Sequence, residues 1–199
     1  MGYFETRAAA PLAQIDDLRL GETTLPAGEG EQLHTDGRKT FRPLIIGLDL
    51  SQEAELVRLL LALDAPSRVS RFLFAASDRS LIEHARRALS TAAWVAGAIV
   101  EGGLRGIAEI YDIGATGGVE AAFLVDRDWR RQGLGTALLR ASQHWAAESK
   151  RAAIRMVFSR GNWPMRRLAS TANARLDLAL DEISAEIPVG EPSRRDRRW

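Results

Sequence analysis

The sequence contains no cysteine, which excludes disulfide bonds, thiolate nucleophiles and cysteine-ligated zinc or iron–sulfur centres. Its three histidines, His34, His84 and His144, lie far apart along the chain, so no histidine-rich metal site is expected either. His84 and His144 fall on predicted helices and are expected at the surface. Any group transfer by this chain must therefore be direct, without a cysteinyl intermediate.

The chain also lacks a strong net charge and long apolar runs. Lys+Arg 27 against Asp+Glu 26 leaves a formal charge of +1, so nucleic acid is not an expected partner. No apolar run approaches the ~20 residues that span a bilayer, and residues 1–10 do not resemble a signal peptide. We therefore expect no membrane partner and a cytoplasmic location. Lys39 and Lys150 are the only lysines, so nearly all positive charge is arginine, which suits forked contacts to phosphate.

The length of 199 residues fits one domain with extensions. Residues 1–39 have poor periodicity and many glycines, which predicts an N-terminal extension with one short strand or hairpin around residues 14–20. Residues 40–189 carry the regular patterns of a domain. Residues 190–199 are expected to form a polar, arginine-rich tail.

Within the domain, the patterns predict alternating strands and helices. Strands are expected at residues 42–46, 93–100, 104–111, 119–125, 152–158, 176–180 and 183–187. Helices are expected at residues 51–63, 78–89, from 133 onward, and 162–172. Ser51 is the expected N-cap of the first helix, and the intervening stretches 65–77 and 112–118 are expected to be loops. This order predicts an α/β (α+β) fold with a mixed sheet and helices on its faces.

The strongest chemical signal lies where a buried strand ends and a helix begins. An arginine-rich turn, with Arg130 and Arg131, leads into Gly133 and Gly135. Glycines let the backbone approach a ligand, and the free N–H groups of a helix start attract anions. The segment therefore predicts a site for a pyrophosphate.

Three phosphate-loop patterns can be compared with this segment. The Walker A pattern needs a lysine between Gly135 and Thr136, and none is present. The dinucleotide-binding fingerprint fails because residues 126–132 separate the strand from the first glycine, and no acidic residue follows about twenty positions later. The pattern Arg/Gln-x-x-Gly-x-Gly after a strand is met by residues 130–135.

This pattern resembles motif A of the GNAT superfamily, the acyl-CoA-dependent N-acyltransferases. The resemblance covers residues 40–189, and locally it is sharpest to the acetyltransferase domain of bacterial protein-lysine acetyltransferases. The shared features are a glutamate that opens the strand, an Asp-Trp pair and an Asn-x-x-Met-x-x-Leu helix, here Glu120, Asp128-Trp129 and Asn162, Met165 and Leu168. Residues 68–72 also resemble the stretch before that family's second helix. The resemblance implies a GNAT-like, mostly antiparallel central sheet with helices on both faces.

By the same resemblance, the cosubstrate is acetyl-CoA and the acceptor is an amine, either a protein lysine or a small molecule; a homodimer is left open. Glu120 would act as the general base, although a strand-end carboxylate without a catalytic role has the same pattern. The residues implied in holding the cofactor are Leu124, Val125, Arg130, Arg131, Gln132, Gly133, Leu134, Gly135, Thr136, Asn162 and Arg166. The backbone N–H of Val125 or a neighbour would meet the oxyanion. No metal ligand is implied.

Two positions depart from the family pattern. Ala169 stands where a tyrosine commonly serves as general acid, and Tyr3 and Tyr111 are the only tyrosines. Asn173 stands where glycine usually ends the helix, a mild change because asparagine tolerates the left-handed conformation. The missing tyrosine keeps a second hypothesis open, namely a non-catalytic acyl-CoA-binding module on the same fold.

Overall fold

The computed structural model describes residues 32–33, 39–40, 42–114 and 117–189. The predicted hairpin at residues 14–20 and the tail at 190–199 lie outside these ranges. The helices are α1 (Glu53–Leu61), α2 (Ala65–Phe72), α3 (Asp78–Thr91), α4 (Leu134–Glu148) and α5 (Trp163–Thr171), with short 3-10 turns at Leu50–Gln52 and Arg127–Trp129. The strands are β1 (Gln32–Leu33), β2 (Lys39–Thr40), β3 (Leu44–Gly47), β4 (Trp94–Val100), β5 (Gly103–Ile113), β6 (Gly118–Val125), β7 (Ala153–Ser159), β8 (Arg175–Leu178) and β9 (Glu182–Pro188).

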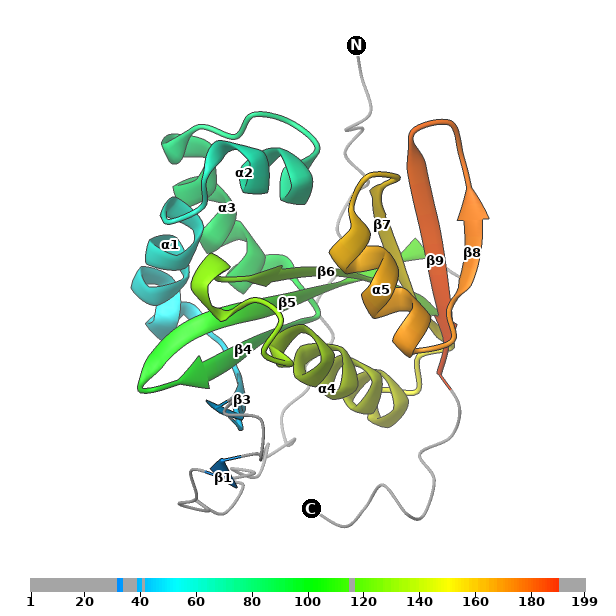
Figure 1. Cartoon of the computed structure of the whole chain (residues 1–199), viewed down its shortest axis with the longest axis horizontal. Helices are drawn as coiled ribbons and strands as arrows, with labels where there is room; N and C mark the ends of the chain where they lie inside the picture. Colours follow the sequence, from blue (N-terminus) through cyan, green and yellow to red (C-terminus); the bar gives the residue numbers. More distant parts are fainter. Residues whose placement is uncertain (1–31, 34–38, 41, 115–116, 190–199) are drawn as a thin grey trace, which may run out of the picture.

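The main sheet of the described residues has seven strands in the order β3-β4-β5-β6-β7-β9-β8 (Figure 1). Every neighbouring pair is antiparallel except β6 and β7, which are parallel and joined through α4. The separate strands β1 and β2 pair with each other. The predicted fold class, a mixed and mostly antiparallel sheet with helices on both faces, is confirmed.

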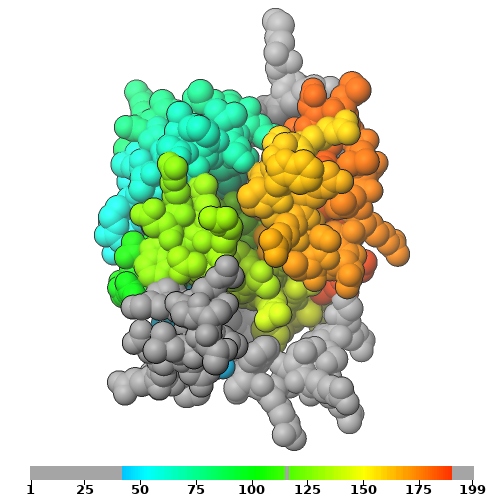
Figure 2. Space-filling model, in the orientation of Figure 1, coloured from blue at the N-terminus to red at the C-terminus, as the bar shows by residue number. Residues whose placement is uncertain are grey.

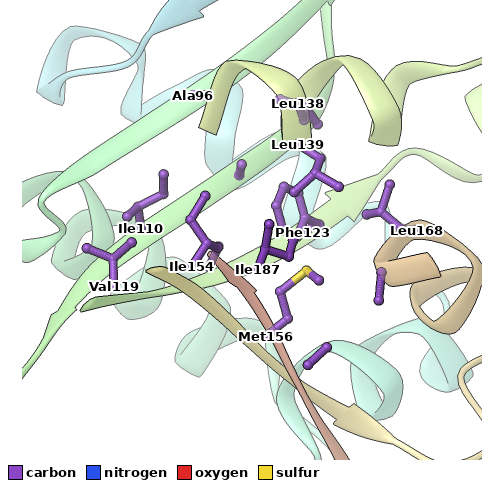
Figure 3. Packing of buried hydrophobic residues seen from close by; sticks show 14 of the residues in the cluster. Ala96, Ile110, Val119, Phe123, Leu138, Leu139, Ile154, Met156, Leu168 and Ile187 are labelled. Atoms are coloured by element: carbon purple, nitrogen blue, oxygen red, sulfur yellow. The ribbon is translucent and has the colours of Figure 1, made fainter. Parts of the chain in front are cut away.

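The two faces of the sheet bury different cores. On one face, α1 and α3 pack against Leu104, Ile107 and Leu124 of the sheet. On the other face, α4 and α5 cover a larger cluster, part of which is drawn in Figure 3. Its labelled members Phe123, Leu139, Ile154, Met156 and Leu168 join β6, β7, α4 and α5 into one apolar layer. Strand alternation therefore sends residues of β5 and β6 to both helical layers, whereas the buried residues of β7 all join the layer under α4 and α5.

Helix α2 corrects the prediction that residues 65–77 form a loop. Asp64 accepts a hydrogen bond from the Ser67 N–H at 2.8 Å, and Pro66 lies in the first turn. Proline needs no hydrogen-bond acceptor at that position, so Asp64 and Pro66 begin a second helix as well as ending the first. The short helix stops at Leu73, whose φ of 63° is left-handed.

Several other element boundaries differ from the predictions by a few residues. Asp49, not Ser51, caps the first helical turn, and Gln52 returns a bond to complete a capping box. β5 ends at Ile113 and β6 begins at Gly118, so the loop between them is shorter than the predicted residues 112–118. The last two strands begin one residue earlier than expected, and the first ends at Leu178.

No helix in the described ranges is long and apolar enough to cross a membrane. Within the same residues, no group of three or more histidine, cysteine, aspartate or glutamate side chains is placed to hold a metal ion.

Candidate active site

The sheet opens between its two parallel strands. β6 and β7 pair only at Val119↔Ile154 and Glu120↔Arg155, although both strands continue beyond these residues. The C-terminal half of β6 therefore has a neighbour, β5, on one side only. The other side presents main-chain groups that a ligand can bind.

The ladder between β5 and β6 shows which groups face this opening. The Asp126 N–H donates to the Arg105 carbonyl at 2.8 Å, one pair beyond Gly106↔Val125. Because hydrogen-bonded pairs alternate along an antiparallel ladder, the main-chain groups of Leu124 face β5 and those of Val125 face the opening. Of the two strand residues predicted to hold the cofactor, Val125 is thus the one with outward main-chain groups.

The opening leads to the start of α4, where the predicted phosphate loop lies. Gly133 is the N-cap with a φ of 88°, and no side chain caps this helix. Arg131 is also left-handed, with a φ of 61°. An α-helix leaves its first N–H groups without intrahelical acceptors, so those of Leu134, Gly135 and Thr136 are directed out of the helix start. This geometry fits an anion such as a pyrophosphate.

The first turn of α4 lies close to α5. A Cβ added at Gly135 would lie 4.0 Å from the Leu168 side chain, so the glycine faces the α4–α5 contact. Asn162 caps α5 through its Oδ1, which accepts from the Met165 N–H at 3.2 Å. Exposed Arg166 lies over the Trp163 ring, 5.3 Å from its centroid. The predicted cofactor residues Asn162 and Arg166 therefore stand on the helix opposite α4.

Two arginines of the cofactor loop contact α2 or the residue that caps it. Arg130 donates through Nε to the Val125 carbonyl at 3.2 Å and through a terminal nitrogen to Ser67 Oγ at 2.9 Å. Arg127 bonds to Asp64 at 3.0 Å. The prediction placed Arg130 at a phosphate, and in this structure its side chain joins the loop to α2.

A cavity of about 620 Å³ lies between α2 and the junction of β7 with α5. Its lining residues are Ala65, Pro66, Val69, Ser70, Ser159, Gly161 and Asn162. Figure 2 shows a furrow between the teal surface of α2 and the orange surface of α5. Asn162 Nδ2 donates to Ser70 Oγ at 2.9 Å across this cavity. The opening in the sheet and the cavity thus share the β7–α5 wall.

Glu120 lies at the last residue pair before β6 and β7 separate. It is half-buried, and its carboxylate has no hydrogen-bond or ion-pair partner among the residues that the structure describes. Its cross-strand partner on β5 is Tyr111. A free carboxylate at the mouth of the opening can accept a proton from a ligand or from water.

Sequence reasoning missed a buried polar cluster beside Glu120. Glu109 of β5 is fully buried, forms an ion pair with Arg71 of α2, and accepts from the Tyr111 hydroxyl at 3.2 Å. His84 Nε2 lies 3.0 and 3.1 Å from its two carboxylate oxygens, so the expectation that His84 is a surface residue is wrong. His144 is exposed as expected and pairs with Glu148.

Electrostatics keep Glu109 ionised in this cluster. Burial alone would raise the pKa of Glu109, but the Arg71 charge and the hydrogen bond from His84 outweigh it and lower the pKa to about 2. The same burial, together with the Glu109 charge, raises the pKa of the Tyr111 hydroxyl. Tyr111 is therefore a neutral hydrogen-bond donor. The one sequence signal was a glutamate among apolar residues at an inward-facing strand position.

The residue that stands at the position of the missing tyrosine packs in the hydrophobic core. Ala169 on α5 is completely buried in the core under α4 and α5. Asn173, which follows α5, has a φ of 53°, so the left-handed helix end predicted there is confirmed.

Comparisons with known proteins agree with this geometry. The GNAT domain of PAT from S. lividans superimposes with a TM-score of 0.67 at 18% identity, covering 80% of this chain and 96% of that one. The ribosomal-protein-S18-alanine N-acetyltransferase of Escherichia coli gives 0.60 at 15% identity, covering 77% and 97%. The PaiA N-acetyltransferase of Thermoplasma acidophilum, in complex with coenzyme A, gives 0.58 at 13% identity, covering 74% and 99%.

A search of curated protein sequences finds no match. The family model described as the acetyltransferase (GNAT) family matches residues 58–169, which include α2, Glu109, Glu120, the phosphate loop and most of α5. The strands β6 and β7, which separate after Glu120, and the glycine-initiated α4 lie within this match. The chain therefore belongs to the GNAT family of acetyltransferases.

Proposed function

We propose that this protein transfers an acetyl group from acetyl-CoA directly to an amine, with a protein lysine preferred over a small-molecule amine. The observation that carries the proposal is the opening between β6 and β7, which runs from Glu120 to the uncapped start of α4. The preference for lysine rests on the likeness of Glu120, Asp128-Trp129 and the Asn162 helix to protein-lysine acetyltransferases.

The residues around the opening fit the parts of the cofactor. The free edge of β6 suits the amides of pantetheine, which can pair with a strand edge, while the Val125 carbonyl itself accepts from Arg130 Nε. The first N–H groups of α4, with Gly133 allowing close approach, suit the pyrophosphate. Arg131 is exposed beside them. Asn162 and Arg166 would flank the cofactor from α5.

The chemistry requires that the acceptor nitrogen lose a proton. A lysine amine has an ordinary pKa near ~10.4, so a base must remove the proton at neutral pH. Glu120 supplies this base, directly or through one water, since its carboxylate is unpaired and at the mouth of the opening. The Val125 N–H, directed into the opening, donates to the carbonyl oxygen as negative charge develops there. Bound acetyl-CoA supplies the activated thioester.

No acid on α5 replaces the family's tyrosine. Ala169 carries no proton donor, and the Thr171 hydroxyl already donates to the Leu168 carbonyl at 2.6 Å. Tyr111 is engaged with Glu109 on the face of the sheet opposite to α5. The leaving thiolate is therefore protonated by water, with the exposed Ser170 hydroxyl able to act only indirectly.

The test is release of thiol from acetyl-CoA with three probes: an Nα-blocked lysine peptide, a peptide with a free α-amine, and an aliphatic diamine. Glu120→Gln should lower kcat by about 10²–10⁴-fold while leaving the Kd for acetyl-CoA unchanged. Glu186→Gln is the matched control and should leave kcat unchanged. Glu186 is exposed on β9, two strands from β6, and is aligned with Glu120 through their shared partner Arg155 on β7. Equal rates for Glu120→Gln and wild type would remove Glu120 from the mechanism.

The second candidate function is a non-catalytic module that binds acyl-CoA, which the loss of the tyrosine at Ala169 favours. In that case acetyl-CoA raises the Tm of the protein, but no amine in the panel releases thiol. If acetyl-CoA does not raise the Tm at all, both candidates are wrong.

A further inference from the structure

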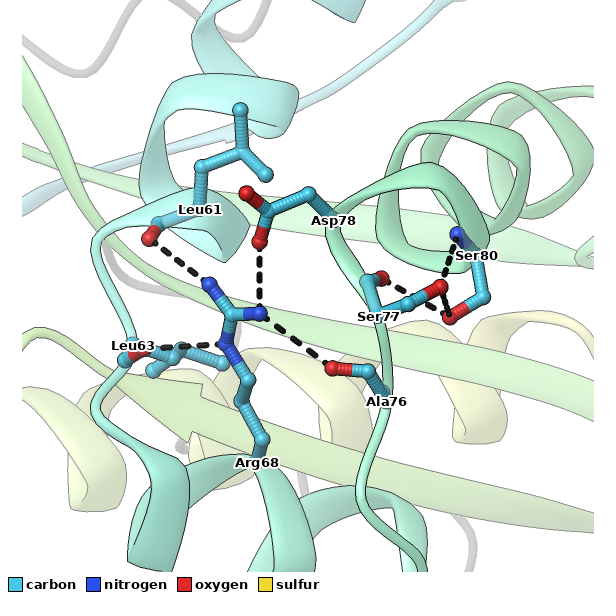
Figure 4. Close-up of polar contacts among 7 residues, drawn as sticks. All are labelled: Leu61, Leu63, Arg68, Ala76, Ser77, Asp78 and Ser80. Carbon is cyan, nitrogen blue, oxygen red and sulfur yellow. Dashed lines mark hydrogen bonds and ion pairs between the residues drawn. The ribbon is translucent and has the colours of Figure 1, made fainter.

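Helix α2 forms one wall of the cavity, yet polar contacts hold most of it in place. None of its residues is buried, and of its apolar side chains only Phe72 packs against a core cluster of the described residues. Arg68 bonds to the carbonyls of Leu61, Leu63 and Ala76 and to the Asp78 carboxylate, which ties α2 to the end of α1 and the start of α3 (Figure 4). These bonds fix the ends of the neighbouring helices and do not reach the sheet.

A charged contact between α2 and the sheet is the ion pair of Arg71 with Glu109. Arg71 is 13% exposed and Glu109 is 0% exposed, so this pair is shielded from water. Arg71 also lies over the Phe72 ring, 4.9 Å from its centroid, and that ring meets His84 edge-on at 5.0 Å. Three elements therefore converge on one carboxylate: α2, α3 and β5.

Helical geometry links this pair to the cavity. Pro66, Val69 and Ser70 share one face of α2, and that face lines the cavity. Arg71 follows Ser70 by one residue, which is about 100° around the helix axis. A fixed Arg71 therefore sets the rotation of α2 and with it the side chains that face the cavity.

The same carboxylate also orients the neighbour of Glu120. Tyr111 donates to Glu109 at 3.2 Å, and Tyr111 is the cross-strand partner of Glu120 on the same face of the sheet. Directly opposite side chains in an antiparallel pair lie about 4.5–5.5 Å apart at Cβ. Glu109 thus contacts both a side chain of α2, the helix that lines the cavity, and the side chain opposite Glu120.

We propose that Arg71 and Glu109 are positioning residues for the amine acceptor, which set the rotation of α2 and the place of the Tyr111 ring so that the acceptor nitrogen reaches Glu120. The inference rests on the proposed acetyl transfer and assigns the acceptor to the cavity between α2 and the β7–α5 junction. The main-chain N–H groups at the start of α4 do not contact this pair, and the cofactor loop meets α2 at its other end, at Asp64 and Ser67. Loss of the pair should therefore change acceptor binding and leave acetyl-CoA binding intact.

The first test is Arg71→Met in the full chain, assayed with the amine probe that wild type uses best. We expect the KM for the amine to rise by roughly ten-fold or more, because a charge-assisted contact is lost, while the Kd for acetyl-CoA stays at the wild-type value. Hydrogen exchange of the α2 amides should accelerate relative to those of α3. Arg71→Lys should recover part of the KM. The matched control is Arg79→Met, which removes an exposed ion pair with Glu83 on α3 and should change nothing.

A double variant separates positioning from stability. Arg71→Met leaves a buried carboxylate uncompensated, whereas Arg71→Met/Glu109→Gln removes both charges and keeps an oxygen that accepts from His84 and Tyr111. We expect the double variant to regain Tm while its KM for the amine stays high. Recovery of Tm and KM together, or a rise in the acetyl-CoA Kd, would overturn the proposal. If wild type releases no thiol with any probe, the proposed function fails. The role of the pair in holding α2 is tested separately: it is supported if Arg71→Met accelerates hydrogen exchange of the α2 amides while acetyl-CoA binding stays unchanged, and contradicted if exchange does not change.

Discussion

Gly133 gives the sharpest test of the cofactor loop because backbone strain and steric clash can be separated at this position. Its φ of 88° is left-handed, while a Cβ built there would meet nothing within 4 Å. A substitution therefore costs backbone strain without a steric clash. For alanine the left-handed conformation costs about 1–2 kcal/mol, asparagine costs less, and a β-branched valine costs more.

The expected order of stability is wild type, Gly133→Asn, Gly133→Ala and then Gly133→Val. For a chain of this size, each 1 kcal/mol lowers the Tm by about 2–4 °C, so differential scanning calorimetry resolves the series. The Kd for acetyl-CoA should rise in the same order, because the first N–H groups of α4 move as the turn relaxes.

Gly102 provides the matched control for this series. It is left-handed with a φ of 69°, and its Cβ would also meet nothing, but it lies in the β4–β5 turn. Gly102→Ala should lower the Tm by an amount similar to that for Gly133→Ala and leave acetyl-CoA binding unchanged. If Gly133→Ala is as stable as wild type, or if Gly102→Ala weakens acetyl-CoA equally, the reasoning about this loop is refuted.

Three further predictions concern the helices and the buried cluster. Leu168→Ala should lower the free energy of unfolding by about 2–5 kcal/mol in urea titrations, since Leu168 is buried between α4 and α5, whereas Leu180→Ala should have no effect because that side chain is 90% exposed. Asp64→Ala should cost about 1 kcal/mol through loss of the α2 cap, and circular dichroism melts with Asp64→Asn as the conservative variant would check it. Glu109 has a lowered pKa of about 2, so its contribution to stability is complete above the ordinary glutamate pKa and is lost as the pH falls toward 2. Acid titration of Glu109→Gln should accordingly show a smaller loss of stability over that pH range than wild type does.

Local signals made the cofactor side of the fold predictable. Gly133 at a helix start, Asn162 at an N-cap and Asn173 after a helix end each have a strong conformational preference that acts within a few residues. The structure places all three in these conformations. The individual strands were predictable for the same reason, because alternation and a Gly102-Gly103 turn are local patterns, while the mostly antiparallel sheet was implied by the family resemblance.

The acceptor side was not predictable, since it depends on contacts between distant residues. Residues 65–77 were predicted to form a loop, and only the Ser67 N–H bonded to Asp64 shows that a helix begins there. Glu109 is 38 residues from Arg71 and 25 from His84, so no spacing pattern connects them. Arg130 was placed at a phosphate from its position in a motif, while its bond to Ser67 spans 63 residues.

The separation of β6 from β7 has a mechanical consequence. Main-chain pairing joins β3 to β6 on one side and β7, β9 and β8 on the other, and only two residue pairs connect these halves. The halves are also joined by the apolar layer of Phe123, Leu139, Met156 and Leu168 (Figure 3) and by the hydrogen bond from Asn162 to Ser70. Side-chain packing, rather than the hydrogen-bond ladder, therefore sets how far the two halves can spread. A molecule that bonds to the free edge of β6 and to α5 at once adds a cross-link where the sheet has none, so occupancy stiffens the whole domain.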